Sequence, residues 1–166
     1  MWWLEVQIRG LPHLPVDWSK MKERDEQYTP KFIFEALNVE FDLDVCAPEG
    51  GVDWIPAKRH YSLKDNALTQ NWEGFVWMNP PFSEGKPWHD KFLQHGNGIC
   101  LVPMSKAYWF QNLWNYVDCS ILMPTPHLKF VQIDGSEKGI FIPLVLAALG
   151  EKGRTALINS QLGKVR

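Results

Sequence analysis

The chain has 166 residues and a formal net charge of −2 at pH 7, with 45% apolar and 22% charged residues. This size favours a single domain over residues 1–166, and the charge excludes a global basic field, so nucleic-acid binding would need a local patch. Three cysteines without paired spacing and five histidines without metal-ligand spacing argue against a disulfide framework and a metal site. No apolar run approaches the ~18 residues of a membrane span, and no signal peptide is apparent. We therefore expect a cytoplasmic protein without membrane contact.

The first part of the chain predicts a peripheral segment, then a helix and a strand. Residues 3–9 alternate and suggest a short strand, whereas residues 10–28 hold glycine, prolines and a charged run, so residues 1–27 are expected to be peripheral. Thr29 as N-cap and Pro30 at the first helical position predict a helix that ends at Asn38. The run 41–47 then predicts a strand.

The rest of the chain alternates strands and helices. We expect strands over 74–78, 98–103 and 119–123, and helices from Pro87 to Gly96 and over 107–117. The runs 128–131 and 139–149 flank a turn at 134–136 and predict a terminal hairpin, and the basic residues 152–166 predict a solvated tail. The alternation indicates an α/β fold with a mainly parallel sheet and a C-terminal antiparallel hairpin.

The most informative stretch is Asn79-Pro80-Pro81-Phe82, which directly follows a short apolar strand. Two prolines cannot continue the strand, so the motif sits at its carboxyl end, where open α/β sheets bind ligands. The Asn79 side-chain carbonyl and the Pro80 backbone carbonyl can accept hydrogen bonds from a planar amino group, and Phe82 can stack on its ring. Taken alone, the tetrapeptide is equally compatible with an ordinary Asn-Pro turn.

Acidic residues beside the strand over 41–47 form a second candidate. A buried unpaired carboxylate is costly, so Asp44 is expected to face a ligand or cap a turn. Asp42 competes for the same role, and both alternatives stay open. Lys58 and Arg59 form a local basic cluster that is more often a solvated patch.

Several segments in the same order and spacing resemble the short phage-type DNA N6-adenine methyltransferases over residues 28 to about 146. They are Tyr28-Thr29-Pro30, residues 41–47, Asp65-Asn66-Ala67-Leu68, residues 72–83, Trp88, Lys91, Leu101-Val102-Pro103 and Trp109-Phe110. The chain departs from the family in three places. It has only Gly50-Gly51 where many methyltransferases have a glycine-rich loop, Pro126-His127 where the family has Gly-Arg, and Phe82 where Tyr is common.

The resemblance implies a Rossmann-like methyltransferase fold that binds S-adenosylmethionine. Thr29 and Pro30 would line the methionine end of the cofactor, and Asp65 would lie near its adenine. The full set of implied cofactor-binding residues is Tyr28, Thr29, Pro30, Asp42, Asp44, Cys46, Asp65 and Asn79. Asn79, Pro80, Pro81 and Phe82 would hold the target adenine as the catalytic residues. The resemblance implies phosphate contacts at Lys86 and Lys91, and the full set of expected DNA contacts is Lys58, Arg59, Lys86, Lys91, His127 and Lys129.

The function that follows is methyl transfer from S-adenosylmethionine to the N6 amine of adenine in double-stranded DNA, with GATC as a recognition sequence suggested by the family. The cell would be a bacterium or a phage-infected host. DNA recognition would use residues 52–72, 83–91 and 124–138. The alternatives are the same chemistry on RNA adenine or protein glutamine, or an inactive relative that binds nucleic acid. The oligomeric state is left open.

Overall fold

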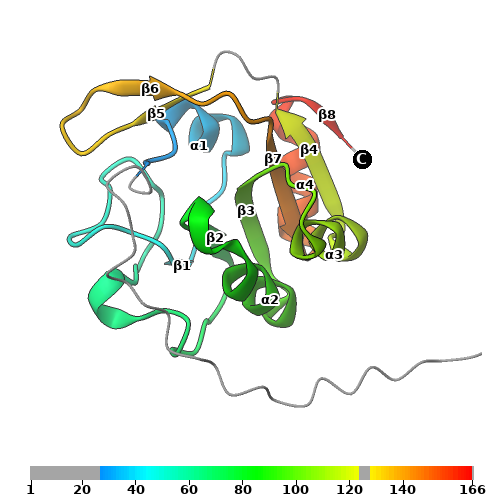
Figure 1. Cartoon of the computed structure of the whole chain (residues 1–166), viewed down its shortest axis with the longest axis horizontal. Coiled ribbons are helices and arrows are strands. Elements are labelled where there is room, and N and C mark those ends of the chain that lie inside the picture. Colours follow the sequence, from blue (N-terminus) through cyan, green and yellow to red (C-terminus); the bar gives the residue numbers. More distant parts are fainter. Residues whose placement is uncertain (1–26, 124–127, 166) are drawn as a thin grey trace, which may run out of the picture.

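The computed structural model describes residues 27–123 and 128–165, so the predicted strand over 3–9 and His127 lie outside the described residues. The helices are α1 (Lys31–Leu37), α2 (Gly85–His95), α3 (Tyr108–Tyr116) and α4 (Glu151–Ser160), with 3-10 turns at Leu63–Asp65 and Phe82–Glu84. The strands are β1 (Leu43–Asp44), β2 (Val76–Met78), β3 (Gly98–Pro103), β4 (Cys119–Met123), β5 (Lys129–Val131), β6 (Glu137–Gly139), β7 (Leu144–Leu149) and β8 (Lys164–Val165). The result is a mixed α/β fold (Figure 1).

The main sheet has six strands in the order β1-β2-β3-β7-β4-β8. β1, β2 and β3 pair in parallel, but β7 is antiparallel to both β3 and β4, and β8 is antiparallel to β4. The sheet is therefore mixed, with β1, β2, β3 and β4 in one direction and β7 and β8 in the other, so the prediction of a mainly parallel sheet is correct only in part. The reason is that the predicted strand 139–149 divides in two. Its first residue, Gly139, belongs to β6, which pairs with β5 in a separate two-stranded sheet, while the buried β7 enters the main sheet.

Helices cover both faces of the main sheet (Figure 1). One core cluster joins side chains of α1 and α4 to Trp77 and Leu101, and the other joins side chains of α2 and α3 to Val76 and Val102. Successive side chains of β2 and β3 therefore point to opposite faces of the sheet and join different clusters, as expected for strands that are covered by helices on both faces. The prediction of a solvated tail over 152–166 was wrong, because α4 packs Gly153, Ala156 and Leu157 against the sheet.

The ends of the first two helices follow from local sequence. α1 ends at Asn38 in the left-handed region with φ of 47°, and α2 ends at Gly96 with φ of 75°, as predicted. The beginning of α1 differs from the prediction, because Pro30 is the N-cap. Thr29 is therefore not the cap, and its side chain makes no capping hydrogen bond to α1.

The segment 56–61 runs beside β1 and widens the sheet at that edge. Backbone hydrogen bonds join Asp44 N to Arg59 O at 2.9 Å and Tyr61 N to Asp44 O at 2.8 Å. β1 is thus enclosed between β2 and this segment, which explains why its residues are buried. Among the described residues, no helix is long and apolar enough to cross a membrane.

Candidate active site

The Asn79-Pro80-Pro81-Phe82 loop leaves β2 at the carboxyl edge of the sheet and leads through a 3-10 turn into α2. Pro80 and Pro81 are buried, whereas Asn79 and Phe82 are partly exposed. Asn79 Nδ2 donates a hydrogen bond to the backbone carbonyl of Gln27 at 2.8 Å. Since a carbonyl can only accept, this contact fixes which branch of the amide is nitrogen and turns Oδ1 away from Gln27.

The segment 27–30 forms one wall beside this loop. Tyr28 pairs with Val131 of β5 through two backbone hydrogen bonds of 2.9 and 3.0 Å, and Trp54 Nε1 donates to the Thr29 carbonyl at 2.8 Å. Thr29 is fully buried, and within the described part of the chain its hydroxyl has no hydrogen-bond partner. Because buried hydroxyl groups are normally satisfied, this one marks a position where a ligand could bind.

Asp44 and Cys46 lie at the carboxyl end of β1, next to the loop. Asp44 is opposite Trp77 in the β1–β2 register and is 3% exposed, and its Oδ1 accepts a hydrogen bond from Cys46 N at 3.0 Å. Burial raises the pKa of Asp44 to about 7, and the Cys46 N–H only partly opposes this. Burial and the nearby Asp44 raise the pKa of the Cys46 thiol, whereas the Asn79 backbone N–H acts in the opposite direction. These contacts bring three predicted site residues together.

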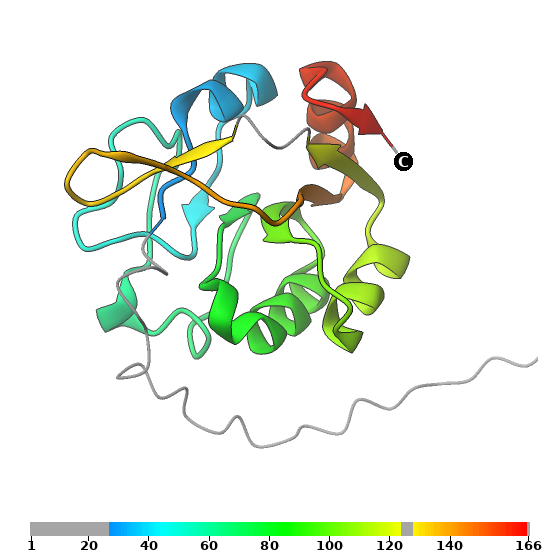
Figure 2. The same cartoon turned by 45° about the horizontal axis from the view of Figure 1, so that its top comes forward.

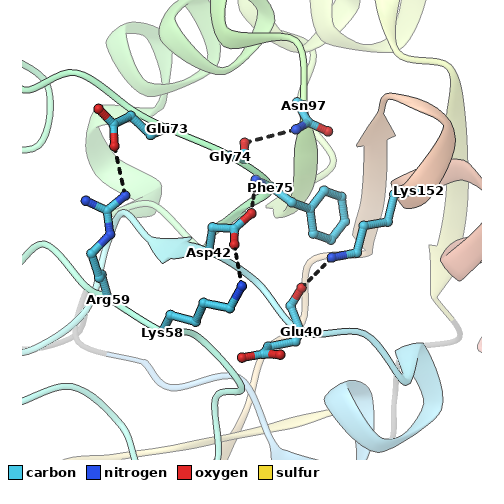
Figure 3. A network of polar contacts seen from close by, with 9 residues as sticks. All are labelled: Glu40, Asp42, Lys58, Arg59, Glu73, Gly74, Phe75, Asn97 and Lys152. Atoms are coloured by element: carbon cyan, nitrogen blue, oxygen red, sulfur yellow. Dashed lines mark hydrogen bonds and ion pairs between the residues drawn. The ribbon is translucent and has the colours of Figure 1, made fainter.

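Asp42 has a different environment, at the other end of β2 (Figure 3). Its carboxylate accepts hydrogen bonds from Lys58 Nζ and Phe75 N, both at 2.8 Å. The hydrogen bond from Lys58, followed by that from Phe75, lowers the pKa of Asp42. The carboxylate therefore joins the segment 56–61 to the beginning of β2, and of the two acids only Asp44 lies beside Asn79.

A pocket opens beside Cys46 on the α2 side of the sheet. Its lining residues come from the end of β1, the 61–67 segment, the Pro81 loop and α2: Val45, Cys46, Ala47, Tyr61, Ser62, Leu63, Asn66, Ala67, Pro81 and Trp88. Asn66 Oδ1 is buried there without a partner among the described residues. The predicted Asp65 forms a capping box with Ser62, whose N–H and hydroxyl both donate to Asp65 Oδ2 and lower the pKa of that carboxyl.

His127 lies outside the described residues, and the other basic residues predicted to contact DNA already have partners within the fold. Exposed ion pairs join Lys58 to Asp42, Arg59 to Glu73, Lys86 to Asp90 and Lys129 to Glu137. Lys91 Nζ donates to the carbonyls of Leu68 and Gln70 at 2.8 and 2.5 Å and lies over the Trp72 ring. Lys91 thus holds the 68–72 segment against α2.

Two features of this site had no signal in the sequence. Gln27 acts through its backbone carbonyl, which any residue could supply, and the orphaned Asn66 Oδ1 depends on a left-handed backbone with φ of 49°. The Asn-Pro-Pro-aromatic motif identified the loop but not the groups that orient it. In the described ranges 27–123 and 128–165, no three histidine, cysteine or acidic side chains cluster as a metal site would require.

Comparison with known proteins relates the chain to a family and to a phage protein. A family model described as "DNA N-6-adenine-methyltransferase (Dam)" matches residues 18–141. A protein named DNA N-6-adenine-methyltransferase, from Haemophilus phage HP1, is 35% identical over 74 residues, which cover 42% of this chain. The aligned region spans 41% of the length of that relative.

Proposed function

Because the chain belongs to the DNA N-6-adenine-methyltransferase (Dam) family, we propose that it transfers a methyl group from S-adenosylmethionine to the N6 amine of adenine in double-stranded DNA. The observation that carries the proposal is the Asn79 amide, oriented by Gln27 on a proline-stiffened loop at the carboxyl edge of the sheet. Open α/β sheets bind ligands at this edge, and we propose a Rossmann-like methyltransferase architecture for the domain. Gln27, which was expected to be peripheral, instead contacts the loop of this site.

The loop would activate the amine by accepting hydrogen bonds from its N–H groups. The N6 lone pair is delocalised into the adenine ring, so acceptors aimed at its hydrogens favour the form in which electron density is localised on nitrogen. Asn79 Oδ1 and the Pro80 carbonyl are the two acceptors we assign. Their positions are fixed in advance by the Gln27 contact and by the proline rings, so little reorganisation is needed in the transition state. Phe82 would stack on the base, as would the tyrosine common in the family.

The neighbouring residues fit the cofactor. A buried hydroxyl without a partner at Thr29 and a buried carboxyl at Asp44 suit a ligand that carries an ammonium group and ribose hydroxyls. When bound, S-adenosylmethionine supplies an electrophilic methyl group on its sulfonium sulfur. We assign Tyr28, Thr29, Pro30, Asp44 and Cys46 to its binding site. Asp65 would act by holding Asn66 at the pocket, and we favour Asp44 over Asp42 because only Asp44 lies beside Asn79.

The target adenine must leave the duplex to reach this loop, at a cost of about a few kcal/mol. Lys86 and Lys129 could exchange their exposed acidic partners for phosphates, because such ion pairs contribute only about 0–1 kcal/mol. GATC is the recognition sequence that we would test first.

The experiment is transfer of a labelled methyl group from S-adenosylmethionine to duplex DNA, RNA and protein acceptors in parallel. Label in the DNA is the expected result. Label confined to RNA or to protein glutamine would move the same chemistry to another acceptor. Binding of DNA without labelling of any acceptor would indicate an inactive relative.

A further inference from the structure

Two segments meet at the carboxyl edge of the sheet and are not used by the site described above. Residues 104–108 follow β3, and residues 138–142 lead from β6 toward β7. Pro103 and Leu144 are partners in the β3–β7 register, and Met104 N donates to the Pro143 carbonyl at 2.8 Å. The two segments therefore lie side by side at this edge, where the link from β6 to β7 runs close to the end of β3 (Figure 2).

Both segments present large apolar side chains to solvent. Phe141 has a relative exposure of 105% and Tyr108 of 73%, and Met104 and Ile142 are also exposed. Fully exposing a phenylalanine forfeits the burial that normally stabilises it, so several such side chains at one place point to a binding surface.

The charges of the two segments are of one sign. They contain Lys106 and Lys138, both exposed, and no acid. Within the described part of the chain, neither lysine forms an ion pair, in contrast to Lys58, Lys86 and Lys129. The adjacent acid Glu137 is paired with Lys129. Unpaired cations interleaved with exposed aromatic rings are the pattern expected for a nucleic-acid partner.

This surface is continuous with the candidate active site. Phe82 contacts Phe130 edge to face with ring centroids 6.0 Å apart, and Phe130 is opposite Lys138 in the β5–β6 register. Phe141 lies three residues after Lys138, on the link that reaches the end of β3, the strand next to β2. The link that carries the exposed Phe141 ring thus begins next to the loop assigned to the target base.

We propose that a DNA duplex docks on the rim surface, defined as Met104, Lys106, Tyr108, Lys138, Phe141 and Ile142, and that Phe141 enters the base stack where the target adenine leaves it. The proposal rests on the proposed function. Extruding a base removes its stacking with both neighbours, and an inserted apolar side chain replaces part of that stacking. Lys106 and Lys138 would contact the flanking phosphates.

The first test compares two DNA duplexes, one with the target adenine paired to thymine and one with it opposite an abasic site. Phe141→Ala should lower kcat/KM by about 10- to 100-fold on the paired duplex, because stacking of one base is at stake, and by less than about threefold on the abasic duplex, where extrusion is easy. Phe141→Trp should retain most of the activity. The control Tyr116→Ala removes an exposed aromatic ring at the other end of α3 and should leave kcat/KM unchanged on both duplexes.

Equal losses on both duplexes, or no loss on either, would overturn the role of Phe141. A 2-aminopurine in place of the target adenine gives a second reading, since its fluorescence rises when it leaves the stack. Phe141→Ala should reduce that rise, whereas a residue that only maintains the fold would leave it unchanged.

The second test needs no catalysis. Lys106→Ala combined with Lys138→Ala should reduce the slope of log affinity for duplex DNA against log salt by about 2, since each phosphate contact contributes about 1. The control is Arg154→Ala, on α4 near the beginning of β3 at the opposite edge of the sheet. An unchanged slope in the lysine variant would overturn the docking surface. If the wild-type protein methylated neither duplex, the proposed function would fail, and this binding measurement would still decide the surface.

Discussion

Asn79 and Asp44 leave neighbouring strands at the same edge of the sheet, yet their surroundings differ in kind. The Asn79 amide is oriented by the backbone carbonyl of Gln27, which is 52 residues away in the sequence. The Asp44 carboxyl is buried with one N–H donor, that of Cys46, and burial raises its pKa to about 7. The first arrangement favours a fixed acceptor, and the second favours a group that changes charge near neutral pH. Each gives a prediction at the scale of a single side chain.

Replacing Asn79 tests the acceptor. Asn79→Ala should lower kcat by about 10²- to 10³-fold, the cost typical of removing one preorganised hydrogen-bonding group, while the affinity for S-adenosylmethionine changes by only a few fold. Steady-state kinetics and calorimetry provide the two measurements. Asn97→Ala is a matched control, because that amide binds Gly74 O at the opposite edge of the sheet. If Asn79→Ala kept its turnover, the assigned role of the loop would be wrong.

Asp44→Asn should change the pH dependence of stability. Because the pKa rises from its ordinary value of 3.8 to about 7 on folding, the folded state holds a proton that the unfolded state has lost, and stability falls as the pH rises through this window. The loss amounts to about 4 kcal/mol above pH 7. The amide variant should match the wild type near pH 4 and be more stable by a few kcal/mol at pH 8, as measured by urea unfolding. Weaker binding of S-adenosylmethionine should accompany this gain. Equal stability at pH 8 would contradict the buried position of Asp44.

At the scale of helices and strands, the boundaries that could be predicted were those set by residues close to the boundary in the sequence. The strands Gly98–Pro103 and Cys119–Met123 match the prediction, because each is a short apolar run that ends at or before a proline. β1 is shorter than predicted, because the chain bends at Asp42. The position of β7 between β3 and β4 depends on long-range pairing, which the spacing of apolar residues does not reveal. The helix α4 has only a weak apolar stripe, so that spacing did not predict it either.

The pairing of β2 with β3 gives an element-scale prediction. A Cβ atom at Gly98 would lie 2.4 Å from the Val76 backbone oxygen and 2.6 Å from its Cγ2, so the strands would have to separate. Gly98→Ala should therefore destabilise the fold by about 1–3 kcal/mol, a cost typical of overpacking. Gly139→Ala, on the exposed β6 where a Cβ meets nothing within 4 Å, should change stability by less than about 0.5 kcal/mol. Similar urea midpoints for the two variants would show that β2 and β3 do not pack as described.

At the scale of the whole molecule, the candidate site is assembled from segments that sequence alone leaves apart. The motif indicated the right loop, and the family resemblance indicated the neighbouring residues, but the Gln27–Asn79 contact and the Tyr28–Val131 pairing depend on tertiary structure. The same holds for charge. A list of basic residues does not reveal that Lys58 and Arg59 pair with acids 16 and 14 residues away, whereas Lys106 and Lys138 form no ion pair within the described residues.

The pH dependence of folding is also a property of the whole molecule. Burial on α2, where His89 is 1% exposed and stacks on Trp109, lowers the pKa of His89 to about 4. The unfolded state then binds the extra proton between pH 4 and 6.5, so His89 makes stability rise with pH, while Asp44 makes it fall. The two slopes should cancel in the wild type between about pH 4.5 and 6.5. In Asp44→Asn, unfolding free energy should instead rise by about 3 kcal/mol across this range, and a flat profile in that variant would contradict the burial of His89.

The most direct test of the central claim is the identity of the methylated nucleoside. Duplex DNA containing GATC and other adenine contexts is incubated with the protein and S-adenosylmethionine, digested to nucleosides and analysed by mass spectrometry, with Asn79→Ala as the control. We predict N6-methyldeoxyadenosine in the wild-type reaction and its near absence with the variant. Methylation of cytosine alone, or unmodified DNA beside methylated RNA or glutamine, would contradict the assignment of adenine in DNA as the substrate.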